Sequence, residues 1–144
     1  SLEEKCGYYG EKLVLFAQEL GLNTCWVAMT YSKIKTAFQV EKGEKLCIVI
    51  ALGYGETQGL PHKSKSMEEV IQLDEPAPEW FQKGVEAALL APTAMNQQKF
   101  LFRLDKNRVS VKAGFGFYTK IDMRIVKYHF EIGAGKEHFQ WELS

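Results

Sequence analysis

The stretch LLAPTAMNQQKF, residues 89–100, joins two apolar segments through a polar turn. Pro92 ends the helix predicted before it, because proline lacks the backbone N–H that a helix interior needs. Phe100 begins a predicted strand on the other side. The polar side chains between these two segments are Thr93, Asn96, Gln97 and Gln98. The chain therefore places a run of amides where a short, plain turn would suffice.

We call residues 92–98 the amide loop. Its amide side chains have two interpretations. Asn and Gln each carry donors and an acceptor. A planar heterocycle with an alternating donor and acceptor edge, such as the pyrimidine ring of a flavin, needs such partners on a rigid backbone. The other interpretation is a solvated connection between a helix and a strand, and the residues alone favour it because polar loops are common.

Apolar residues at helical spacing predict a first helix over residues 8–20. Gly21 stands where a helix end favours a left-handed residue. The side chains expected to form its buried face are Leu13, Phe16, Ala17 and Leu20.

Two further helices are predicted, over residues 79–91 and 123–132. Small residues on the earlier one predict close packing against another element. Its stripe consists of Trp80, Gly84, Ala88 and Ala91. Asp122 is expected to cap the later helix, and Gly133 and Gly135 to end it.

The strands predicted from the sequence complete an α+β fold. The continuous apolar run at residues 46–52 predicts a strand buried on both faces. Residues 100–104 and 108–112 flank a turn and predict a hairpin, and residues 138–143 predict a last strand. No repeat or change in composition divides the chain, so residues 1–144 are expected to form a single domain.

The composition narrows the classes of function. Eighteen basic and eighteen acidic residues give a net charge of zero, so no basic excess favours nucleic acid or an anionic membrane. Three cysteines without a CxxC pair indicate a reducing compartment, so we expect a cytoplasmic protein. The histidines have no spacing typical of a metal site. Ser1 starts the chain without a methionine, and we interpret the sequence as a piece of a longer chain.

Two other stretches could bind a ligand. In GLNTCWVAM, residues 21–29, the backbone could pass close to a flat ring, although the residues alone favour a return of Trp26 to the core. Cys25 has no basic neighbour in sequence to activate its thiol. Lys63 and Lys65 could hold one phosphate as two point charges, or they could belong to an ordinary solvated loop.

The set and order of these stretches resemble the nitroreductase superfamily. The similarity rests on GYYGEKLVLFAQELGLNTCW, IVIALGYG, HKSK, LLAPTAMNQQKF and IDMRIVKYHFEIGAG, and spans about residues 7–141. The order is most similar to the branch in which the amide motif follows the GLGTCW-type motif. The resemblance implies an α+β fold in which helices flank a central mixed or antiparallel sheet.

The resemblance also implies a chemistry and an assembly. FMN would lie at the interface of a homodimer and carry reducing equivalents from NADH or NADPH to a nitroaromatic, a quinone or a similar small acceptor. It implies no catalytic side chain and no metal. The residues that it places at the cofactor are Thr24, Cys25, Trp26, Val27, Ala28, Met29, Lys63, Lys65, Pro92, Thr93, Asn96 and Gln98. Of these, Lys63 and Lys65 would hold the phosphate.

Some residues depart from the superfamily pattern. CWVAM replaces a glycine-containing stretch, QQKF lacks a proline, and the arginine-rich N-terminal arm has no counterpart in this chain. These departures suggest that the chain is the C-terminal part of such a protein. They leave two alternatives open: a flavin-binding or flavin-free relative with a regulatory or interaction role, and a plain α+β domain whose polar loops bind nothing.

Overall fold

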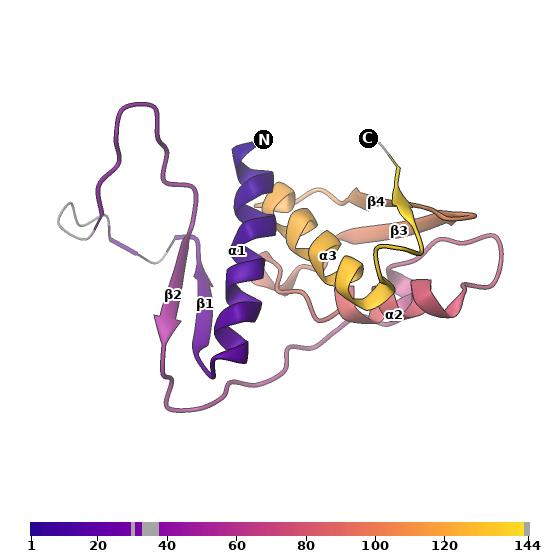
Figure 1. Ribbon diagram of the computed structural model, residues 1–144, viewed down its shortest axis with the longest axis horizontal. Helices are drawn as coiled ribbons and strands as arrows, with labels where there is room; N and C mark the ends of the chain where they lie inside the picture. Colours follow the sequence, from indigo (N-terminus) through magenta and orange to yellow (C-terminus); the bar gives the residue numbers. More distant parts are fainter. Residues whose placement is uncertain (30, 33–37, 143–144) are drawn as a thin grey trace.

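The computed structural model describes residues 1–29, 31–32 and 38–142 (Figure 1). The α+β prediction is confirmed, because within these residues the chain forms three α-helices and two small sheets. In chain order the elements are α1 (Leu2–Glu19), β1 (Asn23–Val27), β2 (Val49–Gly53), a single 3-10 turn (Met67–Glu69), α2 (Glu79–Ala88), a second 3-10 turn (Ala94–Asn96), β3 (Phe100–Asp105), β4 (Arg108–Ala113), α3 (Thr119–Ala134) and β5 (Gln140–Trp141).

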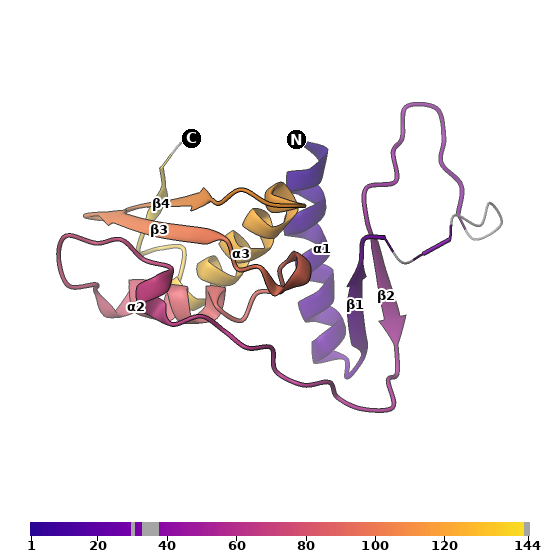
Figure 2. The ribbon, with the colours of Figure 1, turned by 180° about the vertical axis from the view of Figure 1, so that it is seen from behind.

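The resemblance implied one central sheet, whereas the strands of the described residues form two separate small sheets. β1 and β2 pair antiparallel, with Asn23 opposite Gly53 and Val27 opposite Val49. β3 and β4 form the predicted hairpin, and the short β5 adds parallel to β4. Within the described residues, the two sheets stand on opposite sides of α1 and α3 (Figures 1 and 2).

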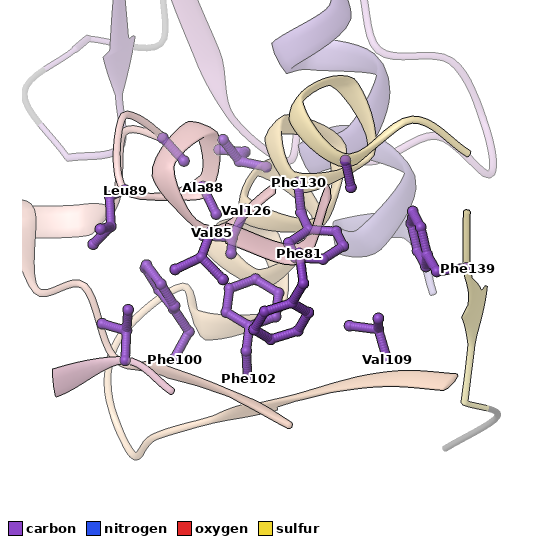
Figure 3. Close-up of a cluster of buried hydrophobic side chains, with 14 of the residues drawn as sticks. Phe81, Val85, Ala88, Leu89, Phe100, Phe102, Val109, Val126, Phe130 and Phe139 are labelled. Carbon is purple, nitrogen blue, oxygen red and sulfur yellow. The ribbon is translucent and has the colours of Figure 1, made fainter. Parts of the chain in front are cut away.

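The apolar core lies where α2 and α3 pack on each other and on the three-stranded sheet (Figure 3). Aromatic rings from all three elements meet there. The rings of Phe102 and Phe130 stack at 4.8 Å between centroids, and Phe81 meets Phe130 edge to face at 5.6 Å. Gly84 makes the close packing possible, because a Cβ there would stand 2.6 Å from Phe130 Cε2. The prediction of close packing along this stripe is confirmed.

Helix α1 begins earlier than predicted and buries a different face. Leu2, not residue 8, is its first residue, and Gly21 has the expected left-handed conformation after its end, with φ of 75°. Of the predicted buried face, only Ala17 is buried; Leu13, Phe16 and Leu20 are exposed. The residues that α1 buries are Gly7, Gly10, Glu11 and Ala17. Helix α1 therefore packs through its glycines, which let α3 and Trp26 approach its backbone.

Three other predicted details were wrong. Helix α3 begins at Thr119, so Asp122 lies in its first turn and is not its cap. Gly133 lies within α3 against the α2 backbone, while Gly135 ends the helix as predicted. Strand β2 is half-buried at Val49 and Ile50 and exposed from Ala51 onward, because only β1 pairs with it among the described residues.

Candidate functional site

A cavity of about 280 Å³ lies where the end of β1, the amide loop and the start of α3 meet. Its walls are mainly apolar. The lining residues are Trp26, Ala28, Met29, Ile48, Pro92, Thr93, Ala94, Met95, Phe117, Tyr118, Ile121, Asp122 and Ile125. We call it the Trp26 cavity. It joins the two stretches singled out in the sequence, since Trp26, Ala28, Met29, Pro92 and Thr93 all line it.

Residues of α1 hold the indole of Trp26 in position. Its Nε1–H donates to Glu11 Oε2 at 3.1 Å. Its six-membered ring lies on Gly10, where a Cβ would overlap the ring. Trp26 is partly buried against the core, as the residues alone favoured, and it also lines the cavity.

The amide loop has an unusual backbone. Met95, Asn96 and Gln98 have φ values of 53°, 51° and 43°, in the left-handed region. Each such residue costs about 1–3 kcal/mol, so the conformation persists only where its surroundings hold it in place. Thr93 provides part of this support, because its hydroxyl accepts a hydrogen bond from Gln98 N at 3.0 Å. The amide loop is thus held in a defined conformation by hydrogen bonds.

The side chains of Asn96 and Gln98 point to the lysine loop (residues 61–66) and not into the Trp26 cavity. Asn96 Nδ2 donates to the carbonyl of Lys63 at 2.9 Å, and Gln98 Nε2 donates to the same carbonyl at 2.8 Å. Gln98 Oε1 accepts from the backbone N–H of Lys65 at 2.9 Å. With Gln98 only 3% exposed, these amides join two loops of the protein.

The two lysines of the predicted phosphate site differ. Lys65 Nζ donates to the carbonyl of Gln98 at 3.0 Å, so its ammonium group helps to hold the amide loop. Lys63 is exposed, and its contribution to the loop contacts is its backbone carbonyl. Lys63 is therefore the better placed of the two to meet an anion in solution.

The remaining predicted residues lie on β1 outside the cavity lining. Thr24 and Val27 are half-buried, and Cys25 is exposed. Side chains alternate between the two faces of a strand, so Cys25 and Val27 face away from the side on which Trp26 lines the cavity. The structure thus brings five of the twelve predicted residues to the cavity and connects three more (Asn96, Gln98 and Lys65) through the two loops.

Asp122 is the polar residue of the site that the sequence did not reveal. Both carboxylate oxygens accept from the backbone N–H of Ala94, at 3.0 and 3.1 Å, and Oδ2 accepts from Gln97 Nε2 at 2.6 Å. Burial raises the pKa of Asp122, while the bonds from Gln97 and Ala94 oppose that rise. Its place in the first turn of a helix was the available signal, and it led to the assignment as a cap.

Phe117 and Tyr118 were also missed. They precede α3, line the cavity, and expose much of their ring surface. Within the described residues, no three His, Cys, Asp or Glu side chains gather as metal ligands would. In the same part of the chain, no helix has the length and apolar character needed to cross a bilayer.

Comparison with known proteins gives two findings. A family model described as "Putative TM nitroreductase" matches residues 1–134. A solved structure, described as a putative nitroreductase from Thermotoga maritima MSB8, has the same fold, with a TM-score of 0.70 and 22% sequence identity. The match covers 91% of this chain and 54% of that one, so this chain spans about half the length of that protein. Among curated proteins, no sequence matches.

Proposed function

Because the chain belongs to the "Putative TM nitroreductase" family, we propose that it is a cytoplasmic FMN-dependent oxidoreductase. It would transfer reducing equivalents from NADH or NADPH to a nitroaromatic, a quinone or a similar small acceptor. When bound, FMN would supply the two-electron chemistry, and the protein would bind, orient and shield it.

The observation that carries this proposal is the Trp26 cavity. Trp26 and Ile125 offer apolar surface to a flat ring, and Tyr118 adds an aromatic side chain to the lining. Asp122 accepts a hydrogen bond from the backbone N–H of Ala94, which lies within the amide loop. Ligand sites are typically apolar clefts of roughly 300–1,000 Å³ with few polar groups. At about 280 Å³, the cavity suits the ring part of FMN and leaves the rest outside it.

The phosphate would lie outside the cavity, and we assign it to Lys63. An ammonium group on a flexible stem binds phosphate as a point charge. Lys65 would act indirectly, because its ammonium group already holds the Gln98 carbonyl at 3.0 Å. Asn96 and Gln98 would likewise position the lysine loop and not read the edge of the ring themselves.

We also propose that the protein works as a homodimer. Tyr9, Leu13, Phe16 and Leu20 form one stripe along α1 and are between 56% and 64% exposed. The spacing of four, three and four residues is that of helices packing against each other. Met29 and Met95, which line the Trp26 cavity, are exposed apolar side chains as well. A second copy that covers this surface would close the site.

One observation favours the flavin-free alternative. The amide groups of Asn96 and Gln98, which would have read the ring edge, are engaged by the backbone of the lysine loop. If the protein is a non-catalytic relative, the amide loop only holds the lysine loop in place.

The test combines binding with turnover. The purified chain is titrated with FMN by flavin fluorescence, and the loaded protein is then assayed for oxidation of NADH and NADPH with a quinone and with a nitroaromatic. We expect saturable FMN binding and acceptor-dependent oxidation of one nicotinamide. FMN binding without oxidation would favour the non-catalytic alternative, and absence of FMN binding would contradict the proposal.

A further inference from the structure

Glu11 is an acid in an unusual place. Its side chain is 1% exposed, and α1 holds it between Trp26 and α3. An ionised carboxylate is rarely buried without partners, because it loses its hydration. Here each oxygen has one partner: Oε2 accepts from Trp26 Nε1 at 3.1 Å, and Oε1 lies 2.7 Å from His129 Nε2.

His129 continues the chain of hydrogen bonds to α2. It is 8% exposed, and its Nδ1 lies 3.2 Å from the carbonyl of Ala87. A carbonyl only accepts, so Nδ1 must carry a hydrogen. One further proton then lies between Nε2 and Glu11 Oε1. Every polar atom of this buried path is paired.

The path ends at the wall of the cavity. It runs from Ala87 on α2 through His129 on α3 and Glu11 on α1 to Trp26 on β1. Of these four residues only Trp26 lines the Trp26 cavity. If Glu11 were absent, the indole N–H would lose its acceptor, and only apolar contacts, with Gly10 and with the core, would define the position of the ring.

We propose that Glu11 and His129 are positioning residues that hold the Trp26 indole as a wall of the cavity. They control how a flat ring binds without touching it. The identity of that ring as a flavin rests on the proposed function, but the control of Trp26 does not.

The two simplest variants of Glu11 are expected to differ in their effect on FMN binding. In Glu11→Gln the amide oxygen can accept from Trp26 while its NH₂ donates to His129 Nε2, so the path stays satisfied. In Glu11→Leu both bonds are lost with little change in volume. Val85→Ala is the matched control, because it opens the buried core at a residue that does not line the cavity and makes no part of the hydrogen-bonded path.

The experiment labels the three tryptophans with ¹⁵N and follows their indole N–H signals, with Trp26→Phe used to assign the Trp26 signal. We expect Glu11→Gln and Glu11→Leu to move that signal while Val85→Ala leaves it in place. With FMN as probe, we expect Glu11→Leu to weaken binding roughly tenfold, as for the loss of one bond to a charged group, and Glu11→Gln to stay within about twofold.

The outcomes separate the two claims. An unmoved Trp26 signal in Glu11→Gln would overturn the inference, and this variant decides the matter even if Glu11→Leu fails to fold. A shift in Val85→Ala as large as that in Glu11→Leu would also overturn it, because general loosening would then suffice. A moved signal in a protein whose wild type binds no FMN would support the positioning role and contradict the proposed function.

Discussion

Asp122, in the first turn of α3, accepts the backbone N–H of Ala94 through both carboxylate oxygens, at 3.0 and 3.1 Å. The two residues are 28 positions apart and belong to the two sides of the Trp26 cavity. The same carboxylate accepts from Gln97 Nε2 at 2.6 Å. One acid thus ties the amide loop, with its left-handed residues, to a helix of the core.

Asp122→Ala should therefore destabilise the protein. It leaves the Ala94 N–H and the Gln97 amide without their acceptor, at a cost of about 1–3 kcal/mol in the free energy of unfolding. Urea unfolding followed by circular dichroism measures this cost. The control is Asp105→Ala, which removes an exposed acid at the end of β3. Equal stabilities of the two variants would show that the carboxylate does not hold the loop.

The pH dependence of stability should carry a signature of Asp122. Burial raises its pKa in the folded protein above the ordinary value of 3.8. The folded state therefore binds this proton more readily than the unfolded state, and the contribution of Asp122 to stability falls as pH rises through the window above 3.8. Compared with Asp122→Asn, the wild type should lose stability as pH rises from about 4 toward neutrality. If the wild type instead gains stability relative to Asp122→Asn over this range, the pKa of Asp122 is not raised in the folded protein.

Substitutions of the two lysines in the lysine loop should have different effects, because the two side chains have different roles. Lys63→Ala should weaken FMN binding, because the exposed ammonium group is the one assigned to phosphate, and should leave the thermal midpoint unchanged. Lys65→Ala should lower the midpoint, since Lys65 Nζ holds the Gln98 carbonyl at 3.0 Å. Fluorescence titration with FMN and thermal unfolding give the two readouts, with Lys42→Ala as an exposed control. If Lys63→Ala binds FMN as the wild type does, the phosphate assignment is wrong.

A charge placed in the α1 stripe should break the proposed homodimer. Leu13→Arg puts a cation in the middle of the exposed apolar stripe, where a second copy would have to desolvate it. Sedimentation should show a dimer for the wild type and a monomer for Leu13→Arg. Gln18→Arg adds the same charge on another side of α1 and should remain dimeric. A wild type that is monomeric at micromolar concentration would exclude self-association through this face.

The sequence predicted the elements whose signals are local. The β3–β4 hairpin, the close stripe of α2 and the left-handed Gly21 each depend on neighbouring residues, and the structure contains all three. Within residues 89–100, Pro92 and Thr93 line the Trp26 cavity, and their role at a cofactor stays a prediction.

The errors concern relationships across long distances in the chain. Asp122 was expected to cap a helix that begins at Thr119, and its hydrogen-bond partner Ala94 lies 28 residues away. The apolar periodicity of α1 identified a real stripe but assigned it to the core, whereas the buried face uses Gly7, Gly10 and the paired acid Glu11. A pattern of hydrophobic residues cannot distinguish a face that meets the core from an apolar face that stays exposed.

The central claim is that the Trp26 cavity takes the ring of FMN, and one measurement tests it directly. FMN is added stepwise to the ¹⁵N-tryptophan-labelled chain while the three indole signals are followed. Trp80, stacked 6.0 Å from Phe139, and Trp141, bonded to Glu131 at 2.9 Å, lie outside the cavity lining and serve as internal controls. We expect a saturable shift of the Trp26 signal with the other two unmoved. A Trp26 signal that stays in place under saturating FMN would contradict it.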